Sequence, residues 1–168
     1  MAFGDEVQKW NSRFAAGEFY FGTAPNAFLT RQADRLLPGT TALCVGDGEG
    51  RNSVWLAEQG LRVSAFDISP VGVEKAQRLA AERGVAVDYS VADINTFDWH
   101  ARRYDVIAVI FIQFANPDER ARIFPGLVDA LAPGGLLLLQ GYTPRQLEYR
   151  TGGPPFVEHL YTEALLRE

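Results

Sequence analysis

The sequence predicts an α/β protein built on a Rossmann-like, doubly wound sheet of about five parallel strands, with helices on both faces. Three observations support this class. From Thr41 onward short apolar runs alternate with helical patterns, a glycine-rich segment follows the first run, and an acidic residue follows each of the next two. We expect residues 1–168 to form one domain, with residues 1–37 as an N-terminal helical cap and residues 41–168 as the ligand-binding core.

The first strand is predicted at residues 41–45, TALCV, where it enters the glycine segment GDGEG. A helix over residues 52–59 ends before Gly60, because glycine is favoured just after a helix. The second strand covers residues 61–66 and closes on Asp67.

The next helix begins with Ser69 as its cap and Pro70 in its first turn, and Gly84 ends it. Residues 85–91 alternate in polarity and lead to Asp93, which predicts the third strand. The remaining elements are predicted as the most buried strand at 104–110, a helix from Asn116 to about Leu131, a turn at 132–135, a fifth strand at 136–140, turns at 143–155 and a short helix at 162–168.

The segment before the sheet is rich in aromatic residues. Either these rings pack the segment onto the domain, or the segment forms a lid over the ligand, and both roles are compatible. The rings belong to Phe3, Trp10, Phe14, Phe19, Tyr20, Phe21 and Phe28.

Composition narrows the class of protein. The hydrophobic fraction of 47% and the charged fraction of 22% are typical of soluble globular chains. No apolar stretch reaches the roughly 18 residues that a membrane span requires, no secretory signal is visible, and the lone Cys44 fits a reducing cytoplasm. The net charge of −5 argues against a nucleic-acid partner. Two histidines and one cysteine without ligand spacing predict no metal site.

The glycine segment predicts a ligand without a diphosphate. Its glycines follow G-x-G-x-G, with Arg51 where a dinucleotide motif has its last glycine. Asp47 and Glu49 stand between them, and a diphosphate beside two carboxylates would cost several kcal/mol. Asp67, 21 residues after Gly46, suits ribose hydroxyls. A ribose-containing cation such as S-adenosylmethionine fits, with Asp93 accepting from the adenine amine between Ile68 and Ile94.

With these features, the sequence resembles the class I S-adenosylmethionine-dependent methyltransferases, and more narrowly the small bacterial branch related to tellurite-resistance methyltransferases. The resemblance extends over nearly the whole chain. It is carried by Trp10 and by the stretches FYFGTAPNAFL (19–29), GDGEGRNSVWLAEQG (46–60), AFDIS (65–69), VADI (91–94), LAPGG (131–135) and GYTPRQL (141–147).

The resemblance implies binding of S-adenosyl-L-methionine, release of S-adenosyl-L-homocysteine, and a role for several residues. Gly46, Asp47, Gly48 and Arg51 would contact the methionine part. Asp67 and Ile68 would serve the ribose and adenine, Asp93 and Ile94 the adenine, and Phe111 the sulfonium side. The N-terminal cap would contribute Trp10, Arg13, Tyr20, Gly22 and Asn26.

Two features depart from the family pattern. Many relatives have an acid where this chain has Cys44, so Asp47 or Glu49 is expected to orient the loop instead. The family's C-terminal antiparallel strand pair is not visible in the sequence, and either truncation or a partner over the fifth strand accounts for that. A monomer and a homodimer remain open.

The methyl acceptor is expected to be a small molecule or an oxyanion such as tellurite, with a thiol, halide or phenol equally consistent. Tyr20, Gln113, Tyr142 and Arg145 are candidates for the acceptor pocket, and His159 is a candidate general base that is more often a structural histidine. Two other functions are kept: a module that binds the cofactor without transfer, and a nicotinamide-dependent oxidoreductase. A P-loop nucleotidase is disfavoured, because G-x-x-x-x-G-K is absent.

Overall fold

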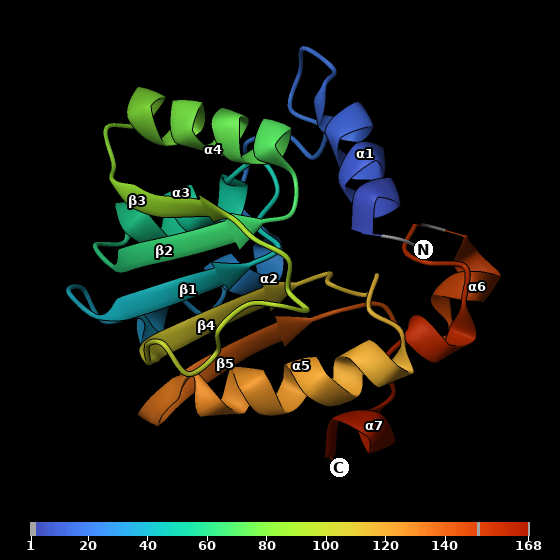
Figure 1. Cartoon of the computed structure of the whole chain (residues 1–168). Helices are drawn as coiled ribbons and strands as arrows, with labels where there is room; N and C mark the ends of the chain where they lie inside the picture. The colour runs from blue at the N-terminus through green and yellow to red at the C-terminus, as the bar shows by residue number, and fades with distance from the viewer. Residues whose placement is uncertain (1–2, 151, 168) are drawn as a thin grey trace.

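A computed structural model describes residues 3–150 and 152–167 of the chain. Its centre is a five-stranded parallel sheet in the order β3-β2-β1-β4-β5 (Figure 1). The strands are β1 (Thr41–Val45), β2 (Arg62–Asp67), β3 (Val87–Val91), β4 (Tyr104–Ile110) and β5 (Leu131–Gln140). The helices are α1 (Phe3–Phe14), α2 (Ala27–Thr30), α3 (Arg51–Glu58), α4 (Pro70–Glu82), α5 (Pro117–Asp129), α6 (Gln146–Tyr149) and α7 (Glu163–Arg167), with short 3-10 turns η1 (Ala33–Arg35) and η2 (Val157–His159).

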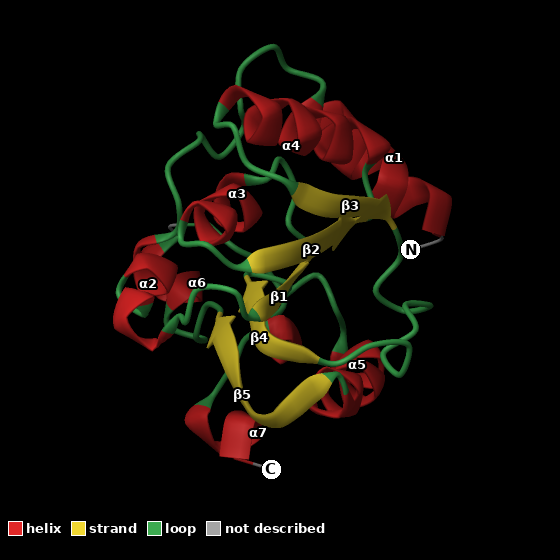
Figure 2. Cartoon of the chain, turned by 90° about the vertical axis from the view of Figure 1, so that its left-hand side faces the viewer, coloured by secondary structure: helices red, strands yellow, loops and turns green. Residues whose placement is uncertain are grey.

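The central strands are buried on both faces. Alternate residues of β1 enter different clusters: Leu43 and Val45 pack with α5, whereas Ala42 and Cys44 pack with α3. Two-sided burial is the reason that these strands read as continuous apolar runs rather than as alternating patterns. Figure 2 shows α3 and α2 on one side of the sheet and α5 on the other, so helices cover both faces as predicted.

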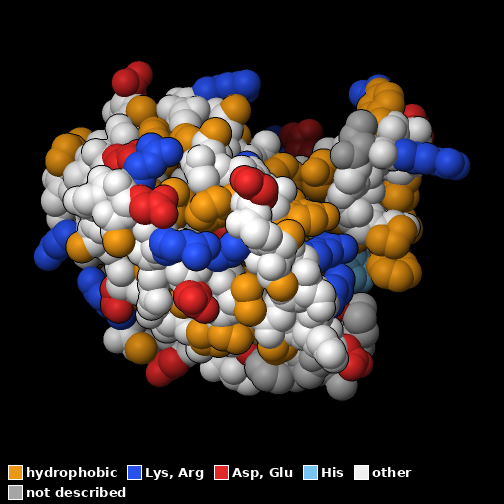
Figure 3. Space-filling model, turned by 90° about the horizontal axis from the view of Figure 1, so that it is seen from above, with side chains coloured by type: hydrophobic (Ala, Val, Ile, Leu, Met, Phe, Trp, Pro, Cys, Tyr) orange, Lys and Arg blue, Asp and Glu red, His pale blue; other side chains and the backbone are white. Residues whose placement is uncertain are grey.

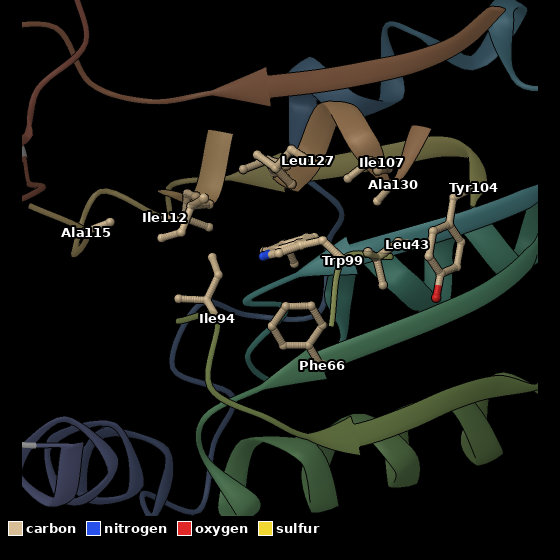
Figure 4. Packing of buried hydrophobic residues seen from close by; sticks show 13 residues of the cluster. Leu43, Phe66, Ile94, Trp99, Tyr104, Ile107, Ile112, Ala115, Leu127 and Ala130 are labelled. Carbon is tan, nitrogen blue, oxygen red and sulfur yellow. The ribbon is translucent and has the colours of Figure 1, made fainter. Parts of the chain in front are cut away.

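The cluster on the α5 face contains aromatic rings next to the carboxyl ends of the strands. Phe66 stacks on Phe97 at 4.2 Å between ring centroids, and Trp99 packs against both rings edge to face. Figure 4 shows Phe66 and Trp99 facing each other, with Ile94 on one side and Leu43 on the other. This packing fixes the chain that follows β3, where Asp93 lies.

The predicted bounds of β1 and β4 are confirmed, and the start of β5 is corrected. The sequence placed a turn at residues 132–135, but β5 already begins at Leu131, which pairs with Tyr104. The register then shifts, so that Val106 pairs with Leu136. The residues expected to form a turn are therefore an irregularity within a longer strand, in which extra residues on one strand are left unpaired and locally interrupt the ladder.

Candidate functional site

The carboxyl ends of four strands meet at one edge of the sheet. Val45 pairs with Phe66 of β2 and with Val109 of β4, and Asp67 pairs with Val91 of β3. The segments that follow these strands therefore lie together. In open parallel sheets this edge binds ligands, at the position where the strand order reverses around β1.

The glycine loop between β1 and α3 needs its glycines for conformation. Gly46, Gly48 and Gly50 all have positive φ, at 59°, 62° and 90°. Gly50 also allows close packing, because a Cβ there would lie 2.7 Å from the Cβ of Ala76 on α4. The loop is thus bent at alternate residues and held against α4.

Asp67 is the last residue of β2, and it binds the glycine loop through a backbone amide. Its two carboxylate oxygens accept from the Gly48 amide at 2.8 Å and from the Ser69 amide at 2.9 Å. Burial raises the pKa of the Asp67 carboxyl, and these backbone hydrogen bonds oppose the rise. A carboxylate has about four lone-pair sites, so both oxygens keep acceptor capacity for a ligand hydroxyl.

Asp47 turns toward the start of α3. Its carboxylate accepts from the hydroxyl and from the amide of Ser53, and the Ser53 hydroxyl lies 2.8 Å from that of Tyr89. Burial raises the pKa of Asp47 to about 7, with Asp67 adding to the rise and Ser53 opposing it. Burial also raises the pKa of the Tyr89 hydroxyl.

Glu49 is fully paired, which corrects the electrostatic reading of the loop. Its Oε1 lies 2.7 Å from Lys75 Nζ, and its Oε2 accepts from the Tyr20 amide at 2.7 Å. The lysine neutralises the second acid that the sequence placed at the mouth of the loop. Asp47 is therefore the acid of this loop that has no lysine or arginine salt bridge within the described chain.

The residues predicted for the adenine side lie in the segments that follow β2 and β3. Ile68 is half-buried, and Asp93 accepts from the Asn95 amide at 2.9 Å, which closes a tight turn. Ile94, at 5% exposure, packs into the aromatic cluster beneath the site. Of this set, the structure leaves Ile68 and Asp93 partly accessible.

Phe111 leaves β4 in a left-handed conformation. Its φ is 60°, and its ring stacks on that of Tyr142 with 4.7 Å between centroids. A bulky residue at positive φ is strained, and such strain concentrates at functional sites. The strained turn places an aromatic pair beside the carboxyl end of the sheet.

The N-terminal cap covers the glycine loop. Trp10 stacks on Phe14, the Arg13 guanidinium lies 4.9 Å from the Trp10 ring, and Phe14 packs against Gly48. The Arg51 guanidinium lies 5.7 Å from the Phe21 ring and donates weakly to the Phe21 carbonyl at 3.4 Å. Burial lowers the pKa of Arg51, with Asp47 and Tyr142 opposing the change.

Other residues predicted for the N-terminal cap also lie near the glycine loop and α3. Asn26 caps α2 with its side chain, and its amide donates to Asn52 Oδ1 at 2.9 Å. Gly22 has a φ of 70°, which a turn requires here. Tyr20 is 52% exposed. The structure therefore packs the cap against the glycine loop and α3.

Two acceptor-pocket candidates, Gln113 and Arg145, and the candidate base His159 make hydrogen bonds within the protein. The Gln113 side chain, at 2% exposure, bonds to the amide and carbonyl of Tyr142 and to the carbonyl of His159. His159 Nδ1 lies 2.9 Å from the Gln113 carbonyl, and Arg145 donates to the Tyr149 hydroxyl at 2.8 Å. Gln113 thus ties Tyr142 and His159 to the end of β4, and its buried side-chain amide already has partners on both its oxygen and its nitrogen.

The sequence analysis did not predict two residues that contact the acids of the glycine loop, Lys75 beside Glu49 and Ser53 beside Asp47. A signal for Lys75 was present, because it stands at the helical spacing of Gly72, Ala76 and Leu79, all buried on one face of α4. A lysine within such a face is expected to have a partner. Ser53 had no comparable signal, since a serine in the first turn of a helix is common.

Within residues 3–150 and 152–167, no group of three or more His, Cys, Asp or Glu side chains is placed to hold a metal ion. Among the helices that the structure describes, none combines the length and the apolar character needed to cross a bilayer.

Comparison with known proteins gives a consistent family. Residues 42–135 match the family model described as a methyltransferase domain. The chain is 32% identical over 123 residues to the cypemycin N-terminal methyltransferase of Streptomyces sp, covering 71% of this chain and 48% of that protein. It spans between about a third and a half of the length of the curated relatives it matches.

Solved structures share the fold. A SAM-dependent methyltransferase from Geobacter sulfurreducens, in complex with S-adenosyl-L-homocysteine, has a TM-score of 0.62 at 23% identity, covering 77% of this chain and 53% of that one. A TehB-like SAM-dependent methyltransferase from Corynebacterium glutamicum has a TM-score of 0.57 at 24% identity, covering 79% and 68%. At these identities the likeness establishes the arrangement of strands and helices.

Proposed function

The chain belongs to the family of methyltransferase domains, and on that premise we propose that it binds S-adenosyl-L-methionine and transfers the methyl group to a small acceptor. One observation carries the proposal. Within the matched segment, a loop of positive-φ glycines follows β1, and Asp67 at the end of β2 holds its central amide. A glycine-bent loop next to a carboxylate with spare acceptor sites suits an amino acid joined to a ribose.

The proposed roles follow the position of each residue. The loop from Gly46 to Arg51 would hold the methionine part, Asp67 and Ile68 the ribose and adenine, and Asp93 the adenine amine. Phe111, stacked on Tyr142, would border the reacting end. Bound S-adenosyl-L-methionine supplies a methyl group on a sulfonium, and transfer leaves S-adenosyl-L-homocysteine.

The protein's contribution to such a transfer is orientation. Holding a nucleophile in line with the methyl carbon in a dry site supplies about 7–11 kcal/mol of the barrier reduction. The cap packs on the loop through Phe14, which is 2% exposed, and so excludes water from that part of the loop. No described histidine or cysteine has to act as a base for this reaction.

The acceptor we propose is a small molecule or an oxyanion. Aromatic side chains border the glycine loop, with Phe21 at 50% and Phe114 at 37% exposure; Phe114 lies near Gly46, and the Arg51 guanidinium lies 5.7 Å from the Phe21 ring. Figure 3 shows small groups of hydrophobic side chains interleaved with Lys and Arg on the face seen from above. A lobe stands at the right-hand edge of this view, in the direction of α6. The exposed aromatic rings and the guanidinium group of Arg51 suit a compact acceptor that is apolar or anionic.

Ligand titration tests the cofactor. Calorimetry with S-adenosyl-L-homocysteine is expected to show binding, while NAD shows none. We expect Asp67→Asn to weaken binding by about 10-fold to 100-fold, because a hydrogen bond to a charged group contributes roughly 1.5–3 kcal/mol. Asp88→Asn, an exposed acid on β3, is the matched control and should bind as the parent does. Binding of NAD in place of the sulfur nucleosides would overturn the proposal.

Product analysis tests the transfer. The chain is incubated with S-adenosyl-L-methionine and a panel of thiols, phenols, halides, amines, tellurite and selenite, and mass spectrometry detects methylated products. We expect one acceptor class to be methylated, with one S-adenosyl-L-homocysteine formed for each product. Tight binding without any product would identify a cofactor-binding module instead of an enzyme.

A further inference from the structure

A buried ion pair joins three parts of the chain that are distant in sequence. Lys75 on α4 and Glu49 in the glycine loop form it, with side-chain exposures of 8% and 3%. Lys75 Nζ also donates to the carbonyls of Ala16 and Glu18 at 2.7 and 2.8 Å. Glu49 accepts from the Tyr20 amide. Residues 16–20 therefore close around the pair.

Every hydrogen-bonding position of the ammonium group is used. An ammonium has three donors, and these reach Glu49 and the two carbonyls. The ring of Phe19 lies 5.4 Å from Nζ and covers it on another side. Two of the three acceptors belong to the N-terminal segment, so Lys75 binds that segment as much as it binds the loop.

A buried ion pair of this kind fixes the position of the segments it joins more than it adds to the free energy of unfolding. Removing two charges from water costs about as much as their attraction returns, so replacing a whole buried pair with apolar groups is often neutral. Removal of one partner alone is costly, because the other charge stays buried. What neutral replacements cannot provide is the ammonium that gathers the carbonyls of residues 16 and 18.

We infer that Lys75 and Glu49 are positioning residues that latch the N-terminal cap over the glycine loop. Their carbonyl and amide contacts hold residues 16–20 in place. That segment leads from α1, which packs on the loop through Phe14, to Phe21, which contacts Arg51. Figures 1 and 2 both show α1 alongside α4. The cofactor-binding consequence rests on the proposed function, whereas the latch itself does not.

The rate of proteolysis in residues 16–20 measures, without any ligand, how firmly Lys75 holds this segment. The peptide bond between Glu18 and Phe19 carries a carbonyl that Lys75 holds, and the Glu18 side chain is exposed to a glutamate-specific protease. We expect Lys75→Met to speed cleavage at this bond at least tenfold. Arg83→Met is the matched control, because Arg83 forms an exposed pair with Glu58 near the end of the same helix, and its cleavage rate should equal the parent's.

A double variant separates positioning from loss of stability. Lys75→Met alone leaves Glu49 buried and unpaired, so its melting temperature is expected to fall. Lys75→Met combined with Glu49→Gln removes both charges and should recover most of the melting temperature, while the Glu18 bond stays rapidly cleaved. A double variant that regains both stability and protection would overturn the inference, as would a folded Lys75→Met chain cleaved at the parent's rate.

Ligand affinity then reports the coupling. If the covering state falls to about a tenth of molecules, the dissociation constant for S-adenosyl-L-homocysteine rises about tenfold in the double variant. Binding unchanged within twofold, despite fast cleavage, would refute the coupling and leave the latch. Failure of the parent chain to bind any sulfur nucleoside would instead refute the proposed function, and the protease result would stand separately.

Discussion

Burial raises the pKa of Asp47 to about 7, so in the folded chain this carboxyl keeps its proton until near neutral pH. In the unfolded chain it loses the proton near its ordinary value of 3.8. Between these values the folded state binds more protons than the unfolded state, so the free energy of unfolding falls as pH rises. The destabilisation is complete above pH 7 and absent below about pH 4.

Asp47→Asn removes that titration. We expect the fall in unfolding free energy between pH 5 and 8 to shrink by about 2–3 kcal/mol, while a fall of the same sign remains from Asp67, whose pKa is also raised. Urea denaturation at four pH values measures the slope. The exposed Asp88→Asn variant controls for net charge, and an unaltered slope in Asp47→Asn would contradict the prediction.

Individual residues show where sequence reasoning about the site stops. The glycines, Asp67 and Asp93 could be predicted to lie at one edge of the sheet because each stands at or just after the end of a strand, and parallel topology brings strand ends together. The partner of Glu49 was not found, because Lys75 is 26 residues away and only the packing of α4 on the loop brings the two charges into contact. The position of the glycine loop after β1 was thus predicted correctly, but its charge was not, because Lys75 neutralises Glu49.

At the scale of elements, the start of α4 connects the site to the N-terminal cap. Ser69 caps this helix by accepting from the Gly72 amide at 3.0 Å. Its hydroxyl also donates to Asn11 Oδ1 on α1 at 2.6 Å. One buried hydroxyl therefore serves two helices, whereas Asn116 caps α5 with a capping box confined to its own first turn.

Comparing Ser69→Ala with Asn116→Ala separates the loss of a helix cap from the loss of the hydrogen bond to α1. Each loses a cap, which costs about 1 kcal/mol of unfolding free energy. Only Ser69→Ala also frees α1, so we expect faster hydrogen exchange in α1 amides for that variant alone. Mass spectrometry of exchanged peptides covering α1 makes the comparison. Equal exchange in both variants would show that α1 is held by its other contacts.

Elements differ in how well their bounds could be predicted. The strands β1 and β4 were located to the residue, because buried parallel strands are bounded by abrupt changes in hydrophobicity. The start of β5 was not, since Pro133, Gly134 and Gly135 are typical of a turn. Pairing with Tyr104 extends the strand to Leu131, and that long-range contact is invisible in local sequence.

At the scale of the whole molecule, one sheet serves two hydrophobic clusters. Leu56 of α3 and Ile123 of α5 are buried in different clusters, at 0% and 1% exposure, on opposite faces. Neighbouring residues of β1 and β4 enter both clusters, so neither cluster can open without losing the strands that support the other. The carboxyl edge that forms the site depends on both.

Unfolding should therefore be a single transition. Leu56→Ala and Ile123→Ala are each expected to cost about 2–5 kcal/mol, because both delete a large buried side chain. Trp99 packs in the α5 cluster and Trp55 against the α3 cluster, so tryptophan fluorescence reports both faces and far-ultraviolet circular dichroism reports the helices. We expect the two signals to coincide along a urea titration in the parent and in both variants, with lower midpoints in the variants. Two separated transitions in Leu56→Ala, with fluorescence changing before circular dichroism, would show that the faces unfold independently, and the shared sheet would then not couple the α3 side of the site to the α5 side.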